Sequence, residues 1–83
     1  MKYRVHVRVM PRAGMLDPAG QAIEHALESL GFAGAGNVHL GKAIALELEA
    51  PTRDSAALRV QEMCQRLLAN PVTEDFSVVV EDG

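Results

Sequence analysis

The chain is organised around the stretch Met10-Pro11-Arg12-Ala13-Gly14-Met15-Leu16-Asp17-Pro18-Ala19-Gly20. Connections between a strand and a helix usually take about two to six residues, and this one is longer. Asp17 followed by Pro18 predicts a helix that begins at Pro18, because aspartate accepts hydrogen bonds from free amides and proline suits the first helical position. The residues before Asp17 therefore predict an irregular loop that either carries function or contacts a partner.

The segment before this loop alternates between apolar and cationic side chains. Its apolar positions are Tyr3, Val5, Val7 and Val9, and its polar positions are Lys2, Arg4, His6 and Arg8. A period of two is typical of a strand with one face buried and the other exposed. Residues 2–9 are therefore predicted to form a half-buried strand with a cationic outer face.

The segments after the loop predict two helices and three further strands. Ile23, Ala26, Leu27 and Leu30 recur at helical spacing, and Gly31 ends that helix. Residues 38–40 and 44–48 alternate on either side of Gly41 and predict a hairpin. Thr52 or Asp54 caps a second helix that Asn70-Pro71 ends. Its predicted buried stripe includes Val60, Cys64, Leu67 and Leu68, and residues 76–80 predict a last strand.

The resulting order is strand, helix, strand, strand, helix, strand. We expect an α+β, ferredoxin-like βαββαβ fold of a single domain, residues 1–83. Its four-stranded antiparallel sheet has the order 4-1-3-2, with both helices on one face, because crossovers are nearly always right-handed. In that order Glu47 and Glu49 share the outer face with the cationic first strand and partly neutralise it.

Composition narrows the classes of function. The 83 residues carry a net charge of −3, which argues against a nucleic-acid partner. The single cysteine, Cys64, suits a reducing compartment, and no apolar run suggests a membrane span or a signal peptide, so a cytoplasmic protein is expected. A chain this short buries only about 60% of its unfolded surface, so self-association would stabilise it.

No constellation of side chains points to catalysis. His6, His25 and His39 lack the spacing of metal ligands, and Cys64 falls in an apolar helix stripe. We therefore predict no catalytic, cofactor-binding or metal-binding residue in this chain. An acylphosphatase-like site built from Arg12 and Asn37 is a weak alternative, because the glycine-rich loop of those enzymes is absent.

Several motifs resemble the PurS family, the small subunits of phosphoribosylformylglycinamidine (FGAM) synthase. They are Gly14 to Gly20, Leu30-Gly31-Phe32, Val38 to Lys42, and Met63 to Phe76, so the resemblance covers nearly the whole chain. Met15, Thr73 and Phe76 stand where the family usually has valine, isoleucine and tyrosine. The segment Ser55-Ala56-Ala57-Leu58 is also less acidic than is usual in the family.

This resemblance implies a non-catalytic subunit of a glutamine- and ATP-dependent ligase complex in purine biosynthesis. The implied partners are a second copy of the chain, as dimer or tetramer, a large PurL-like synthetase subunit and a PurQ-like glutaminase subunit. ATP and Mg²⁺ are expected in the large subunit. A free-standing ACT-like module that binds a small effector is the alternative. The candidate subunit-interface residues are Arg12, Gly14, Met15, Leu16, Asp17, Lys42, Leu58, Asn70 and Pro71.

Overall fold

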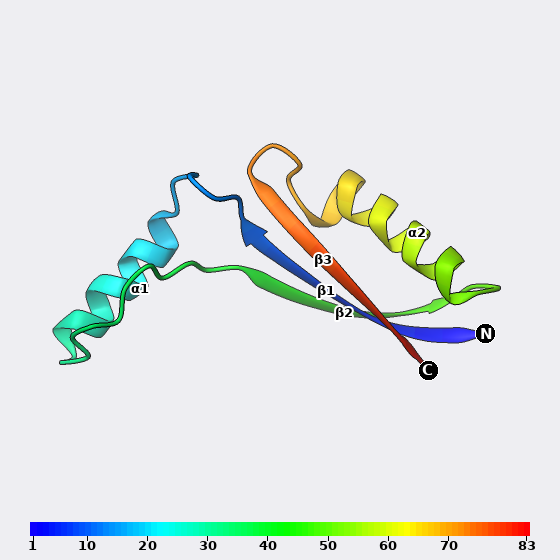
Figure 1. The fold of residues 1–83 in the computed structure, drawn as a ribbon, viewed down its shortest axis with the longest axis horizontal. Helices are drawn as coiled ribbons and strands as arrows, with labels where there is room; N and C mark the ends of the chain where they lie inside the picture. The colour runs from blue at the N-terminus through cyan, green and yellow to red at the C-terminus, as the bar shows by residue number, and fades with distance from the viewer.

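The structure, a computed structural model, describes all residues, 1–83. Its elements in chain order are β1 (Lys2–Pro11), α1 (Pro18–Ser29), β2 (Lys42–Glu49), α2 (Arg53–Met63), the π-helical turn η1 (Cys64–Leu68) and β3 (Glu74–Asp82). The three strands form one sheet, α2 lies across one of its faces, and α1 projects beyond one end of the sheet (Figure 1). No helix is both long and apolar enough to cross a membrane.

The first strand is the centre of the sheet, and both neighbours run antiparallel to it in the order β2-β1-β3. Val5 lies opposite Leu46 on one side and Val80 on the other, so three apolar rows share the inner face. The predicted charge pairing on the outer face is confirmed, since Arg4 lies opposite Glu47 and Lys2 opposite Glu49. The Lys2 ammonium also lies 3.5 Å from the Glu47 carboxylate.

The core lies between the inner face of the sheet and α2. Val5, Val7 and Val9 are buried against Val60 and Cys64 of the helical segment. Thr52 starts α2, because its hydroxyl accepts a hydrogen bond from the Ser55 amide at 3.1 Å. Only 10 of the 83 residues are buried, so this core is small even for a chain of this length.

The end of the second helix departs from regular α-helical spacing. The Ala69 amide donates to the Cys64 carbonyl at 2.9 Å, which is the five-residue step of a π turn. This wider turn rotates the last side chains around the helix axis. Leu68 packs against the core, whereas Leu67, predicted to be buried, is 81% exposed.

The predicted ferredoxin-like fold is wrong. The sheet has three strands and not four, residues 38–40 are not a strand, and α1 does not lie beside α2 on the sheet. The order 4-1-3-2 and the placement of both helices on one face are therefore corrected. What remains is a three-stranded antiparallel sheet covered by one helix, with the other helix standing apart.

Side-chain hydrogen bonds explain the missing strand. The Val38 amide donates to the Glu24 carboxylate at 3.1 Å, and the Leu40 amide donates to the Asp17 carboxylate at 3.1 Å. Both acceptors belong to α1 or to its cap. Because these carboxylates occupy the amides that a strand ladder needs, the segment lies along α1 and does not join the sheet.

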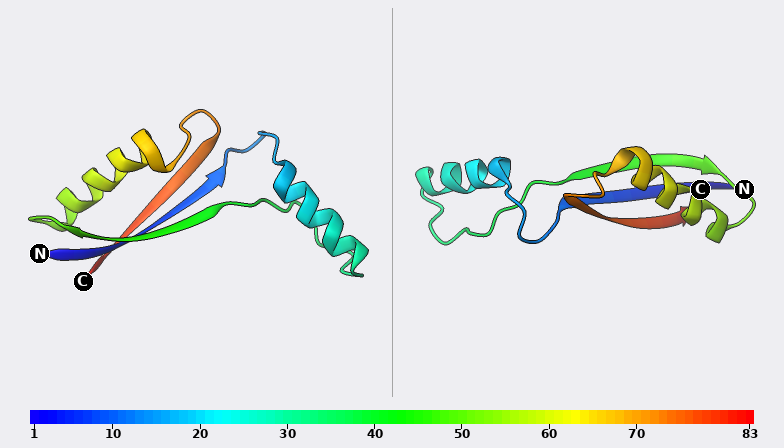
Figure 2. Two further views of the ribbon diagram at one scale, coloured as in Figure 1. Left: turned by 180° about the vertical axis from the view of Figure 1, so that it is seen from behind. Right: turned by 90° about the horizontal axis from the view of Figure 1, so that it is seen from above.

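The molecule is consequently long and thin. Its Cα radius of gyration is 16.1 Å, and it extends 50 × 26 × 14 Å. A compact chain of this length has a radius of gyration of about 12 Å. The two further views show α1 and the segment that follows it as an arm beyond the sheet (Figure 2). Gly20 is the only buried residue of α1.

Candidate association surfaces

Arg12 joins the end of β1 to the loop before β3. Its guanidinium donates to the carbonyls of Pro71 (2.8 Å), Val72 (3.2 Å) and Glu74 (3.3 Å) and to the Asp75 carboxylate (3.2 Å). The Arg12 amide also donates to the Thr73 carbonyl at 2.8 Å. This planar group with five donors is suited to such a set of acceptors, so Arg12 fixes the two loops together.

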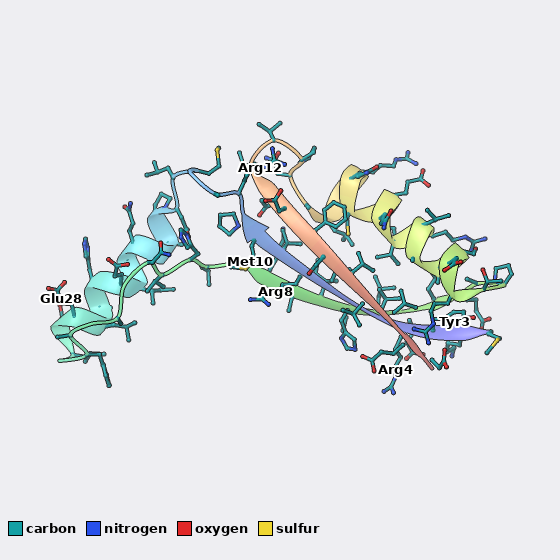
Figure 3. The ribbon with its side chains drawn as sticks, viewed as in Figure 1. Tyr3, Arg4, Arg8, Met10, Arg12 and Glu28 are labelled. Atoms are coloured by element: carbon teal, nitrogen blue, oxygen red, sulfur yellow. The ribbon has the colours of Figure 1, made fainter.

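Asn70 shapes the loop that Arg12 holds. Its side-chain oxygen accepts from the Val72 amide at 3.0 Å, and its carbonyl accepts from the amides of Thr73 and Glu74. The Glu74 carboxylate accepts from the Asn70 amide at 2.7 Å. The predicted interface residues Arg12, Asn70 and Pro71 therefore lie together at one end of the sheet, where Figure 3 labels Arg12.

Asp17 fixes the arm to the start of β2. Its carboxylate accepts from the Gly20 amide at 3.0 Å, the Leu40 amide at 3.1 Å and His39 Nδ1 at 3.2 Å. The predicted helix cap is thus confirmed, but the same group also bonds a segment more than twenty residues away. Its side chain is only 10% exposed. The backbone hydrogen bonds from Gly20 and Leu40, more than the contact with His39, hold the pKa of Asp17 below its ordinary value of 3.8.

The lowered pKa of Asp17 predicts a pH-dependent stability. A carboxyl group whose pKa is lower in the folded state stabilises the fold above its unfolded pKa and loses that effect as the pH falls through the folded pKa. Wild type should therefore unfold at a higher temperature than Asp17→Asn near neutral pH. The difference should shrink as the pH falls below 3.8. Thermal unfolding of both proteins at one concentration measures it, and a difference independent of pH would contradict this role.

Gly20 lies against the segment that Asp17 holds. A Cβ atom at this position would lie 2.4 Å from the Val38 carbonyl oxygen and 2.4 Å from an Asp17 carboxylate oxygen. Only glycine permits so close an approach of α1 to residues 38–40. Asp17 and Gly20 thus act together to set the direction of the arm relative to the sheet.

The other candidate interface residues are spread over the molecule. Gly14 lies in the loop with a positive φ of 83°, and Met15 and Leu16 beside it are exposed. Lys42 is the first residue of β2, and Leu58 is exposed on α2. The structure brings Leu58 near none of the others, and the interface role of all nine residues stays a prediction.

The sequence did not predict that the apolar stripe of α1 is exposed in a single chain. The stripe of α1 predicted as core is uncovered, with Ile23 37% and Leu30 73% exposed and Phe32 beyond it 61% exposed. On the sheet, α2 packs over β1 and β3 and leaves the inner row of β2 only partly buried. That inner row is Ile44, Leu46 and Leu48. The helical period identified the stripe, but no pattern in the sequence says which chain covers it.

Other features of the structure provide no reactive group at these surfaces. Cys64 is a free cysteine, fully buried in the core, and burial raises the pKa of its thiol. No three His, Cys, Asp or Glu side chains come together where they could hold a metal ion. The fold and its exposed apolar arm define a class of protein, that of small α+β chains with one helix standing apart from the sheet.

Comparison with known proteins identifies the family. Residues 4–82 match the family model of PurS, phosphoribosylformylglycinamidine (FGAM) synthase. The PurS subunit of Bacillus subtilis is 42% identical over 80 residues, which cover 96% of this chain and 94% of that protein. The chain belongs to the PurS family of FGAM synthase subunits. Because the chain belongs to this family, the alternative of a free-standing ACT-like module is set aside.

Solved structures of the family share the fold. The crystal structure of the PurS subunit of FGAM synthase (EC 6.3.5.3) from Thermotoga maritima has a TM-score of 0.88 and 32% identity, covering 96% of this chain and 92% of that one. A chain in the structure of PurLQS from the same organism has a TM-score of 0.88 and 32% identity, covering 96% of this chain and 98% of that one.

Proposed function

We propose that this chain is the small, non-catalytic subunit that assembles the other subunits of FGAM synthase. It forms a homodimer, and the dimer joins a PurL-like synthetase subunit to a PurQ-like glutaminase subunit. Ammonia released from glutamine then reaches the synthetase site, where ATP-dependent amidation of formylglycinamide ribonucleotide takes place. Family membership and the likeness to a chain of the Thermotoga PurLQS structure support the choice of partners.

The uncovered arm is the observation that carries the proposal of a dimer. In a split-βαβ fold the first helix would pack over the sheet beside the second helix. Here Asp17 and Gly20 hold α1 away from the sheet, and the inner row of β2 is left without a helix. One copy therefore has both an apolar helix stripe and an incompletely covered sheet face. In a two-fold dimer, each α1 covers the other copy's β2, so both surfaces are buried by one symmetric exchange.

The free energy gained by burying these side chains in the dimer is expected to be large compared with the stability of so small a domain. Burying an apolar side chain of the size of Ile23 or Leu30 contributes about 1.5–3 kcal/mol. Each α1 that covers β2 of the other copy buries several such side chains. Two-fold symmetry gives the dimer two of these contacts. Domains of this size are stable by only about 5–15 kcal/mol, so the dimer and the fold are stabilised together.

The ligands of the reaction belong to the partners in this proposal. ATP and Mg²⁺ bind the large subunit, and the present chain supplies neither a catalytic group nor a cofactor site. Its contribution is to hold the glutaminase and the synthetase in a fixed position relative to one another, because ammonia transfer requires it. The loop fixed by Arg12 lies at the end of the sheet from which the arm projects, so both can provide such contacts there.

Reconstitution tests the function directly. Adding the chain to PurL-type and PurQ-type subunits of the same organism should restore glutamine-dependent FGAM synthesis. Synthesis from ammonia by the large subunit should depend on the chain much less. The mass of the chain in solution, alone and with both partners, should show first a dimer and then a complex of all three. No complex in the presence of glutamine and nucleotide would refute the proposal.

A further inference from the structure

The outer face of the sheet is hollowed along β1. Three adjoining hollows of about 570, 340 and 270 Å³ lie on this side, the first sharing His6 with the second and Arg8 with the third. Small side chains beside β1 make the depression, namely Ala43 and Ala45 on β2 and Ser77 on β3. No helix covers this face, because α2 lies on the other side and α1 stands beyond the end (Figures 1 and 2).

The charge along this trough changes from one end to the other. Arg4 lies between Glu47 and Glu81, and His6 Nε2 lies 3.1 Å from the Glu81 carboxylate. Arg8 lies directly between Ala43 and Ser77. Asp75 lines the third hollow with Arg8, but its carboxylate pairs with Arg12 at 3.2 Å. One end of the trough is therefore neutralised within the chain, whereas the end at Arg8 is cationic.

Arg8 is one of the cations of this acidic chain whose side chain has no partner within the chain. Lys2, Arg12, Arg53 and Arg66 each pair with a carboxylate, at 3.5, 3.2, 2.8 and 3.2 Å. The side chains of Arg8 and Lys42, which line the same hollow, have no hydrogen bond or ion pair. Figure 3 shows Arg8 on the side of the sheet away from α2. Met10 and Val79 line the same hollow, so an apolar surface adjoins the free guanidinium.

We infer that the trough beside Arg8 is the docking site for an acidic, extended segment of one of the larger subunits. A carboxylate of that segment pairs with Arg8, and a neighbouring apolar side chain covers Val79 and Ala45. Guanidinium groups bind carboxylates through two parallel hydrogen bonds, which fixes both position and orientation. The inference rests on the proposed function, because it names the surface that one of those partners uses.

The charges favour such a segment over a second copy of this chain. Sheets that pack face to face lie about 10 Å apart with their strands within about 30°. Because β1 is the central strand, back-to-back packing of two copies would cross β1 on β1. Arg8 of one copy would then meet a face whose acidic residues Glu47 and Glu81 already pair with Lys2 and His6, so a second copy offers it no free carboxylate. An acidic partner supplies such a carboxylate.

Charge reversal at Arg8 tests the inference in the assembled protein. Binding of the dimer to preassembled PurL-type and PurQ-type subunits is measured with glutamine and nucleotide present. Arg8→Glu should raise the Kd at least about tenfold. Arg8→Lys keeps the charge but loses the two parallel hydrogen bonds, so its Kd should lie between those of wild type and Arg8→Glu. Arg59→Glu, the same charge change on α2, should leave the Kd nearly unchanged. Raising the salt from about 0.05 to 0.5 M should weaken wild type more than Arg8→Glu.

The outcomes separate this inference from the function on which it rests. If wild type binds no partner, the proposed function fails, and the inference fails with it. If wild type binds and Arg8→Glu binds equally well, only the inference fails. A homo-oligomer whose mass falls in Arg8→Glu would identify a second copy as the occupant. Inorganic phosphate that stabilises wild type but not Arg8→Glu would identify a small anion, and either result would overturn the inference.

Discussion

Ile23→Asp is expected to convert the dimer into a monomer. Ile23 lies in the apolar stripe of α1, which one copy is proposed to bury against β2 of the other, and it is 37% exposed within one chain. A carboxylate there would be buried without a partner in the dimer but would remain in water in the monomer. Two-fold symmetry introduces the penalty twice. The dimer Kd should therefore rise by about 100-fold or more, as measured by sedimentation equilibrium.

The matched control for this variant is Gln21→Asp. It adds the same charge to the same helix, but on the side away from the stripe, so the dimer should persist. The helical circular dichroism of Ile23→Asp should also remain, because α1 already stands apart from the sheet in one chain. Glutamine-dependent synthesis should be lost with the dimer. If Ile23→Asp keeps the mass of the dimer, the proposed exchange of α1 is wrong.

The sheet shows how much of the fold could be predicted from sequence. Residues 2–9 alternate over their whole length, and Tyr3, Val5, Val7 and Val9 are all buried. A shift of one residue would turn this row to solvent, so the pattern fixes the register strongly. The pairing of β1 with β2 and β3 follows from it. The caps at Asp17 and Thr52 were also predictable, because a helix cap depends only on residues within one turn of the helix.

The arm shows why the rest of the fold was not predictable. Residues 38–40 alternate too briefly to fix a strand, and their amides bond to Asp17 and Glu24, which lie far before them in the sequence. The stripe of α1 predicts burial, but a hydrophobic period does not say whether the cover belongs to the same chain. A fold that a second copy completes, as proposed here, would therefore have the same sequence pattern as a fold completed by its own helix.

The candidate site was predictable only in part, because some of its contacts join residues far apart in the sequence. The sequence placed Arg12 among the candidate interface residues, which stays a prediction, but it did not predict the hydrogen bonds that Arg12 makes within the chain. Its acceptors lie in residues 71–75, about sixty positions further on, where no local pattern reveals them. Arg8 is one cation in a regular alternation, and only the pairing of strands showed that Ala43 and Ser77, and no acidic residue, lie directly opposite it.

Gly20→Ala is expected to destabilise the protein, against the ordinary preference of helices. Alanine in a helix interior is more stable than glycine by about 1 kcal/mol. At this position, however, its methyl group would lie 2.4 Å from the Val38 carbonyl oxygen and from an Asp17 carboxylate oxygen. Carbonyl and carboxylate cannot both withdraw while Asp17 still holds the Leu40 amide. The arm must therefore separate from residues 38–40, and we expect a loss of about 2–4 kcal/mol, as for other overpacked sites.

Gly36→Ala is the matched control for Gly20→Ala. Gly36 has no atom near its added methyl group and no positive φ, so alanine there should be neutral or slightly stabilising. Denaturant unfolding of both variants at equal concentration measures the difference. Because the arm carries the proposed dimer contact, Gly20→Ala should also weaken dimerisation, whereas Gly36→Ala should not. If Gly20→Ala proves as stable as wild type, then contact between α1 and residues 38–40 does not set the direction of the arm.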